Sequence, residues 1–254
     1  MPVFIFVLVL GLFLGSFVYN TAIRLSQKKS LLSASHCDYC KKKVGWIGLI
    51  PIFGYLLFRG KCRHCKKKIS IGYPLFELFS AFLCVLILWK VRLTSINLLY
   101  FIFLFEAFLL VALLDFKTHY IYPQPILFAF ALRIVWLVFY QNHLWLDSLI
   151  GMAVGAGTFH FISYFYQVFR GRVGLGEGDA TLLGLIGFCF GWKVLLPTIF
   201  MSAISGLIGG GLFLLFKKKG IREEIPFAPW MMVGIFCVWM VGEKKVSSLI
   251  TIFS

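Results

Sequence analysis

Long apolar runs separated by short polar segments restrict the fold of this chain more than any other feature. Hydrophobic residues make up 60% of the sequence and charged residues only 14%, whereas an ordinary soluble domain carries about 25% charged residues. A membrane-spanning helix needs about 20 apolar residues. The sequence therefore predicts an all-α polytopic membrane protein with about eight transmembrane helices. The expected spans are residues 3–23, 74–89, 96–114, 125–140, 146–169, 180–192, 195–216 and 227–241.

The basic residues predict how the chain is oriented in the membrane. The formal net charge is +15, and residues 24–68 hold twelve Lys or Arg but one acid. Nucleic-acid binding could use such an excess, but the concentration of basic residues in loops favours the positive-inside rule. We therefore divide the chain into a first helix (1–23), a cytoplasmic loop (24–73) and a transmembrane domain (74–254). Alternation of the spans then places Asp115 and Asp179 at cytoplasmic ends.

Two aspartates at the ends of apolar runs are the candidate catalytic residues. Asp115 ends the run 98–114, and Asp179 closes the tetrapeptide Gly176-Glu177-Gly178-Asp179. Charges beside hydrocarbon are costly, which makes them functional candidates. Two carboxylates that share one proton can hydrolyse a peptide bond. The helix dipole at the start of span 180–192 favours an ionised Asp179, and the two glycines permit an open turn. Alternatively, Asp179 is only a helix cap and Asp115 a surface residue.

Two further acids fall inside predicted spans and are weaker candidates for function: Glu77 and Glu106. Glycines with small-xxx-small spacing predict close helix contacts. They form the pairs Gly151/Gly155, Gly187/Gly191 and Gly206/Gly210.

Four cysteines in the cytoplasmic loop form two C-x-x-C pairs separated by 21 residues. The pairs are Cys37 with Cys40 and Cys62 with Cys65. Four thiolates at this spacing suit a closed, structural zinc site, and a reducing cytoplasm argues against disulfides. A redox motif or a metal-free loop are the alternatives. Lysines 41–43 and 66–68 flank the pairs alike and suit an anionic lipid surface.

The ordered set of motifs is more specific than any one of them. It comprises Gly15-Ser16-Phe17, Ser35-His36-Cys37-Asp38-Tyr39-Cys40, residues 55–65 (YLLFRGKCRHC), residues 69–78 (ISIGYPLFEL), Asp115 and Gly176-Glu177-Gly178-Asp179. With this set the chain resembles the type IV prepilin peptidases, aspartic proteases of the Gly-x-Gly-Asp class, over nearly its full length. Its compact length and Lys/Phe-rich composition resemble those of the competence-type enzymes of Gram-positive bacteria.

The resemblance implies a bacterial plasma-membrane enzyme that removes the basic leader of prepilins and pseudopilins after a glycine, at the cytoplasmic face. Asp115 and Asp179 would be catalytic, and Gly176 and Gly178 would form the active-site loop. Many members also methylate the new amino terminus with S-adenosylmethionine, and three positions match that activity: Gly60, Lys61 and Glu77.

Two departures bear on local geometry and substrate preference. Thr181 stands where the family usually has lysine. Pro123 follows Asp115 about one position later than the corresponding proline does in the family. The alternatives are a peptidase without methyltransferase activity, a transporter or assembly scaffold whose aspartates bind protons or ions, and a DNA-binding membrane protein. Nucleic acid is the least expected partner.

Overall fold

The computed structural model describes residues 1–31, 35–37, 39–91, 95–171, 176–217 and 226–242. Asp38, which belongs to one of the motifs, lies outside these residues. Within them the regular structure is helical, apart from two isolated bridges, His36 with Lys43 and Lys61 with Lys68. The predicted all-α class is confirmed for the described part of the chain.

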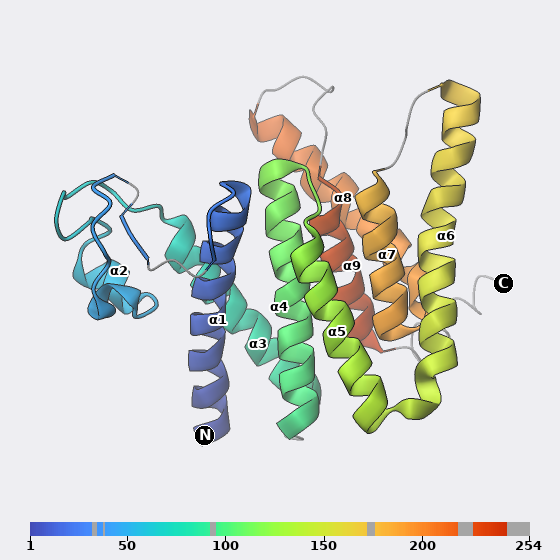
Figure 1. The fold of residues 1–254 in the computed structure, drawn as a ribbon, viewed down its shortest axis with the longest axis horizontal. Coiled ribbons are helices and arrows are strands. Elements are labelled where there is room, and N and C mark those ends of the chain that lie inside the picture. The colour runs from blue at the N-terminus through green and yellow to red at the C-terminus, as the bar shows by residue number, and fades with distance from the viewer. Residues whose placement is uncertain (32–34, 38, 92–94, 172–175, 218–225, 243–254) are drawn as a thin grey trace. The chain divides into compact units, whose positions relative to one another are not determined.

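Six helices in these residues are long and apolar enough to cross a membrane, so the prediction of a multi-pass membrane protein is confirmed. They are α1 (Pro2–Ser26), α3 (Gly72–Val91), α4 (Ser95–Thr118), α5 (Pro123–Tyr140), α6 (Trp145–Arg170) and α8 (Leu195–Lys217). The shorter α7 (Glu177–Phe190) and α9 (Ala228–Val241) each have 14 residues. They correspond to two of the predicted spans, and the count of eight stays a prediction. Figure 1 labels these helices along the chain.

The chain divides into two compact units, Met1–Glu106 and Ala107–Ser254, with the boundary inside α4. The predicted division at residues 23 and 73 remains a prediction. The first unit contains α1, the 3-10 helix η1 (Trp46–Leu49), the short α2 (Phe53–Leu57) and α3. Helices α1 and α3 pack closely, because a Cβ built on Gly15 would lie 2.8 Å from the carbonyl oxygen of Phe76.

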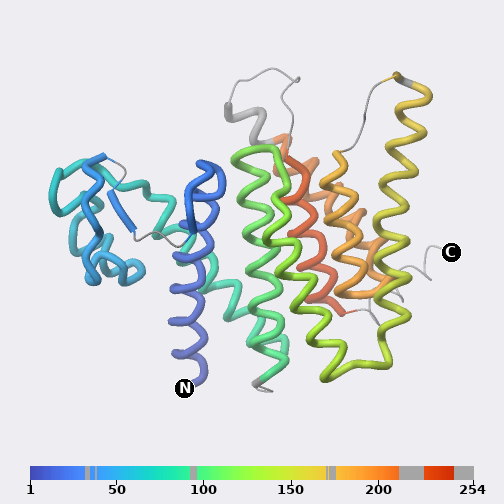
Figure 2. The backbone as a smooth tube through the Cα atoms, in the orientation of Figure 1, coloured from blue at the N-terminus to red at the C-terminus, as the bar shows by residue number. Residues whose placement is uncertain are grey.

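In the second unit, α6 and α7 run side by side (Figure 2). The backbones of Gly151 and Gly187 meet, and a Cβ on Gly155 would lie 2.5 Å from the carbonyl oxygen of Leu183. These three glycines therefore make the helix contact that their spacing predicts. The connections η2 (Asn142–Leu144) and η3 (Trp192–Val194) lie directly before α6 and α8.

Three helix ends come together in the second unit and position the candidate site. The loop after α4 packs on the start of α7, since a Cβ on Gly178 would lie 3.0 Å from the Cβ of Ile121. The last turn of α4 also reaches the start of α9 through Asp115. The start of α9 follows from its sequence, because Pro229 occupies its first turn, where a missing N–H leaves no helical bond unmade.

Candidate functional site

Asp115 lies in the last turn of α4 and is buried. Its Oδ2 accepts a hydrogen bond of 3.0 Å from the backbone N–H of Ala228, the first residue of α9. The first amides of a helix have no partner within the helix, and they stabilise a negative charge. The start of α9 therefore favours the ionised form of this carboxyl group.

Asp179 lies in the first turn of α7, a helix that is not one of the six candidate spans. Its backbone N–H donates to the carbonyl oxygen of Gly176 at 3.1 Å, and its Oδ2 would lie 3.5 Å from a Cβ on that glycine. Burial, and then the negative charge of Asp115, raise the pKa of Asp179 to about 6. The two predicted aspartates are thus close enough to interact electrically.

The two carboxyl groups have unlike surroundings. Asp115 receives a backbone amide, whereas the half-buried Asp179 feels the charge of Asp115. Like charges at short range divide a pair into one ionised and one protonated member. The Ala228 amide on Asp115 favours the proton on Asp179, whereas the α7 dipole favours the ionised form of Asp179. Burial and the neighbouring charge oppose the dipole.

The glycines of the tetrapeptide contribute in different ways. Gly176 has an extended backbone (φ −69°, ψ 140°) that any residue can adopt. Gly178 permits the close approach of Ile121, because the space of its missing Cβ is taken by that side chain. Sequence reasoning did not identify Ile121 or the Ala228 amide. A proline at the start of α9 was the one available signal for the amide.

The four loop cysteines form one cluster. Their sulfur atoms all lie within 4.8 Å of one another, with Cys37 and Cys65 at 3.8 Å and Cys40 and Cys62 at 3.9 Å. Four sulfurs about 2.3 Å from a tetrahedral zinc ion would be separated by about 3.8 Å. The arrangement therefore fits a zinc ion with all four positions filled by protein.

The two cysteine pairs have matching backbones, as their flanking lysines suggested. The backbone N–H of Cys37 donates to the carbonyl oxygen of Lys42 at 3.0 Å, and that of Cys62 donates to the carbonyl oxygen of Lys67 at 2.9 Å. Amide groups of Cys65 and His64 lower the pKa of Cys62 to about 6, which favours the thiolate form of this residue. The Lys67 amide acts to lower the pKa of Cys65, but burial and the neighbouring thiols outweigh it and raise this pKa to about 11.

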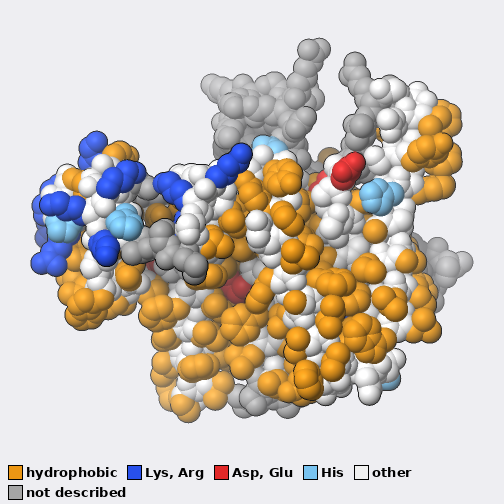
Figure 3. Space-filling model, in the orientation of Figure 1, with side chains coloured by type: hydrophobic (Ala, Val, Ile, Leu, Met, Phe, Trp, Pro, Cys, Tyr) orange, Lys and Arg blue, Asp and Glu red, His pale blue; other side chains and the backbone are white. Residues whose placement is uncertain are grey.

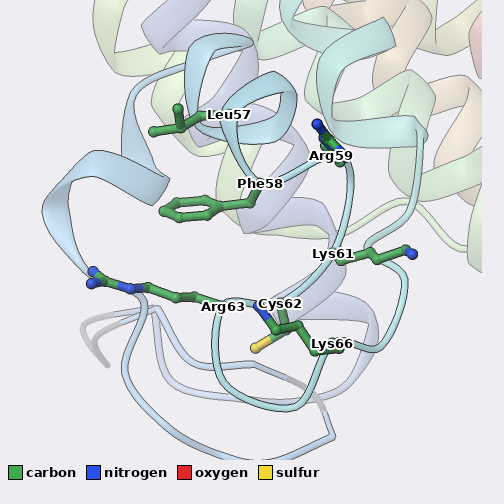
Figure 4. A pocket seen from close by; sticks show the side chains of 7 residues that line it. All are labelled: Leu57, Phe58, Arg59, Lys61, Cys62, Arg63 and Lys66. Atoms are coloured by element: carbon green, nitrogen blue, oxygen red, sulfur yellow. The ribbon is translucent and has the colours of Figure 1, made fainter.

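The residues matched to methylation fall in two places. Gly60 has φ +64°, where a side chain would be strained, and Lys61 follows it. Figure 4 shows Lys61 with the other residues around a cavity of about 320 Å³. The cavity is lined by Leu57, Phe58, Arg59, Lys61, Cys62, Arg63 and Lys66.

Glu77 lies on α3, where it is buried and accepts a 2.7 Å hydrogen bond from Ile52 N–H. Among the described residues no hydrogen bond or ion pair joins it to Gly60 or Lys61. The structure thus brings the aspartates together and the cysteines together, but it gives Glu77 a contact that the sequence did not predict.

Glu106 is buried near the middle of α4 and contacts the hydroxyl of Ser80 and, at 3.6 Å, the thiol of Cys84. The Ser80 hydroxyl also contacts the Gly11 carbonyl oxygen at 2.8 Å. This acid links α4 to α3 within the first unit, whereas both aspartates belong to the second unit.

Two family models match the chain. One is described as the bacterial peptidase A24 N-terminal domain and matches residues 9–91. The other is described as the type IV leader peptidase family and matches residues 101–211. No solved structure gives a significant match to the chain.

Curated relatives named prepilin leader peptidase/N-methyltransferase match most of the sequence. The relative from Bacillus subtilis (strain 168) is 29% identical over 241 residues, 94% of each chain. That from Pseudomonas putida is 27% identical, over 94% of this chain and 91% of its own. That from Myxococcus xanthus (strain DK1622) is 31% identical, over 88% of this chain and 67% of its own. The chain therefore belongs to the type IV leader peptidase family.

Proposed function

We propose that this protein is a membrane aspartic endopeptidase that removes the leader peptides of prepilins and pseudopilins, with Asp115 and Asp179 as its catalytic pair. The observation that carries the assignment is the meeting of the ends of α4, α7 and α9, which brings the two carboxyl groups within electrostatic reach of each other. Prepilins are the substrates named for the relatives, and the basic loops favour an active site on the cytoplasmic side.

The reaction needs one ionised and one protonated carboxyl group. Asp115, held by the Ala228 amide, takes a proton from a water molecule whose oxygen attacks the peptide carbonyl carbon. Asp179 gives its proton to the carbonyl oxygen, and a neutral tetrahedral intermediate results. The intermediate collapses as the leaving nitrogen takes the proton from Asp115 and a hydroxyl proton returns to Asp179. The C–N bond breaks, and both carboxyl groups regain their starting states.

We assign the cysteine cluster to a structural zinc ion held by Cys37, Cys40, Cys62 and Cys65. Four protein thiolates leave no open position for substrate or water, so the metal would fold the loop and take no part in hydrolysis.

We further propose that the N-terminal unit methylates the newly exposed amino terminus. S-adenosylmethionine, when bound, would supply the methyl group. The cavity beside Lys61 falls within the size range of small-molecule sites, and its cationic side chains suit a ligand carboxylate. Gly60 shapes the turn before Lys61, and Glu77 holds Ile52 in place.

Co-expression of the full chain with a prepilin tests the peptidase assignment. Leader removal, scored by mass, is expected to fall at least about 100-fold in Asp115→Asn and in Asp179→Asn, because each removes one member of the proton-transfer pair. Asp147→Asn is the matched control, since it removes an acid from the first turn of α6. Full cleavage by either catalytic variant would exclude the pair.

A second assay separates methylation from proteolysis. Purified protein is incubated with cleaved pilin and a labelled methyl donor, so that leader removal is not required. Lys61→Ala is expected to lose label transfer while cleaving prepilin normally. Absence of transfer by the wild-type protein would indicate a peptidase alone.

A further inference from the structure

The loop between α1 and α3 contains an exposed apolar segment that the catalytic proposals do not use. We define the apolar segment as residues 46–57, which include η1 and α2. Trp46 is 75% exposed and Leu56 is 66% exposed. Leu49, Phe53 and Leu57 are exposed as well. A cluster of large apolar side chains on the surface marks a site of interaction.

The apolar segment is attached at the depth of the membrane-spanning helices. Ile52 N–H is bonded to Glu77, and the Cα of Glu77 would lie 2.9 Å from a Cβ on Gly15 of α1. At 1.5 Å per residue, Gly15 lies about 20 Å from the start of α1 and about 16 Å from its end. A hydrocarbon core is about 30 Å thick, so the attachment point lies beside the lipid-embedded part of α1.

The flanking residues carry the complementary charge for a phospholipid surface. Residues 35–68 contain nine Lys or Arg and one acid, Asp38. Four of these cations, Arg59, Lys61, Arg63 and Lys66, line the cavity next to Leu57. In Figure 3 the basic side chains of this loop, at the left, gather above its hydrophobic side chains. Such a division matches an interfacial element, with apolar groups in the acyl region and cations at the phosphates.

We propose that the apolar segment inserts into the lipid bilayer and that the cations of the loop outside the Lys61 cavity, Lys41, Lys42, Lys43, Lys67 and Lys68, bind anionic phospholipid headgroups. The apolar segment thus contacts the lipid of the same membrane that α1 and α3 cross. The loop is therefore a membrane-anchored platform that holds the cysteine cluster and the Lys61 cavity at the headgroup level. This inference does not depend on the peptidase assignment.

Photo-crosslinking in the full-length protein tests the proposal. A photoreactive amino acid replaces Leu56, and the protein is reconstituted in vesicles of phosphatidylcholine alone or with phosphatidylglycerol. The matched control carries the same group at Lys42, an exposed position of the first cysteine pair. We expect adducts on lipid acyl chains at position 56, more in the anionic vesicles, and adducts on headgroups alone at position 42. Protein adducts at position 56, or equal acyl-chain labelling at both positions, would overturn the insertion.

Two variants give independent readouts. The fluorescence difference between wild type and Trp46→Phe is expected to be quenched by lipids brominated on the acyl chain. A variant with Lys41, Lys42 and Lys43 all changed to Gln is expected to lose the preference for anionic vesicles in labelling at position 56, while it keeps its zinc content. If the Trp46 fluorescence is not quenched, the apolar segment does not contact the acyl chains. If the lysine variant keeps the preference for anionic vesicles, these lysines do not bind the headgroups.

Discussion

The contact between α6 and α7 permits a prediction with an internal control. Gly155 and Gly157 lie two residues apart in α6. A Cβ on Gly155 would lie 2.5 Å from the carbonyl oxygen of Leu183 in α7, whereas a Cβ on Gly157 would have no atom within 4 Å. The change to alanine therefore adds the same methyl group and the same helix propensity at both positions, and only one position has an obstacle.

The size of the effect follows from that distance. Ordinary contacts of a Cβ begin at 3.4 Å, so α7 must move by about 0.9 Å to admit the methyl group. Overpacking of this kind costs about 1–3 kcal/mol, and alanine gains about 1 kcal/mol over glycine in a helix. Both variants gain this helix propensity, so it does not contribute to the difference in stability between them. Gly155→Ala should thus be about 1–3 kcal/mol less stable than Gly157→Ala, which corresponds to about 2–10 °C in melting temperature.

The same displacement should reach the aspartate pair. Leu183 lies four residues after Asp179 in α7, about one helical turn away. A shift of α7 at Leu183 would move Asp179 relative to Asp115, and in the proposed mechanism cleavage depends on that distance. We expect Gly155→Ala to cleave prepilin more slowly than Gly157→Ala. Thermal unfolding in detergent and leader removal by mass are the two measurements, and equal values for both variants would refute the packing argument.

Three further predictions use single residues. Wild-type protein should contain about one zinc ion per chain by elemental analysis, and Cys62→Ser should lose it and make the loop sensitive to protease. Burial and the charge of Asp115 raise the pKa of Asp179 from 3.8 to about 6, so the folded state binds this proton more tightly than the unfolded state. The free energy of unfolding should therefore fall as pH rises from 3.8 to about 6, and this slope should be absent in Asp179→Asn. Glu106→Ala should lower stability by about 2–5 kcal/mol, because it leaves a cavity at a buried position between α3 and α4, while Glu106→Gln, which keeps the side-chain volume, should have a smaller effect on the melting temperature.

Local patterns predicted much of this molecule. Apolar runs of sufficient length indicated the six long helices, because spanning a bilayer needs little beyond length and composition. The cysteine cluster was also predictable, since metal-ligand spacing within each pair is set by a few neighbouring residues. The bounds of α7 and α9 were within three residues of the expected spans.

Long-range contacts were not predictable in the same way. The approach of Asp115 to Asp179 depends on the packing of Ile121 against Gly178, which are far apart in the sequence. The partner of Asp115 is a backbone amide, and backbone groups have no residue signature in a sequence. The expectation that the helix dipole keeps Asp179 ionised stays a prediction, and the Ala228 amide and the burial of Asp179 act against it.

Two buried acids of this protein accept a hydrogen bond from a backbone amide. Glu77 accepts the N–H of Ile52 at 2.7 Å, and Asp115 accepts the N–H of Ala228 at 3.0 Å. Both amides belong to backbone at the start of a helix, where no earlier carbonyl can serve them. Where such an amide faces the protein interior, an acid side chain can supply the missing acceptor. A carboxylate at such a place has a structural reason to be present, and catalysis at Asp115 requires in addition the second carboxyl group that Asp179 provides. Glu77 has no such neighbour among the acids of its unit that the structure describes, which favours a positioning role for Glu77 and leaves peptide hydrolysis to the aspartates.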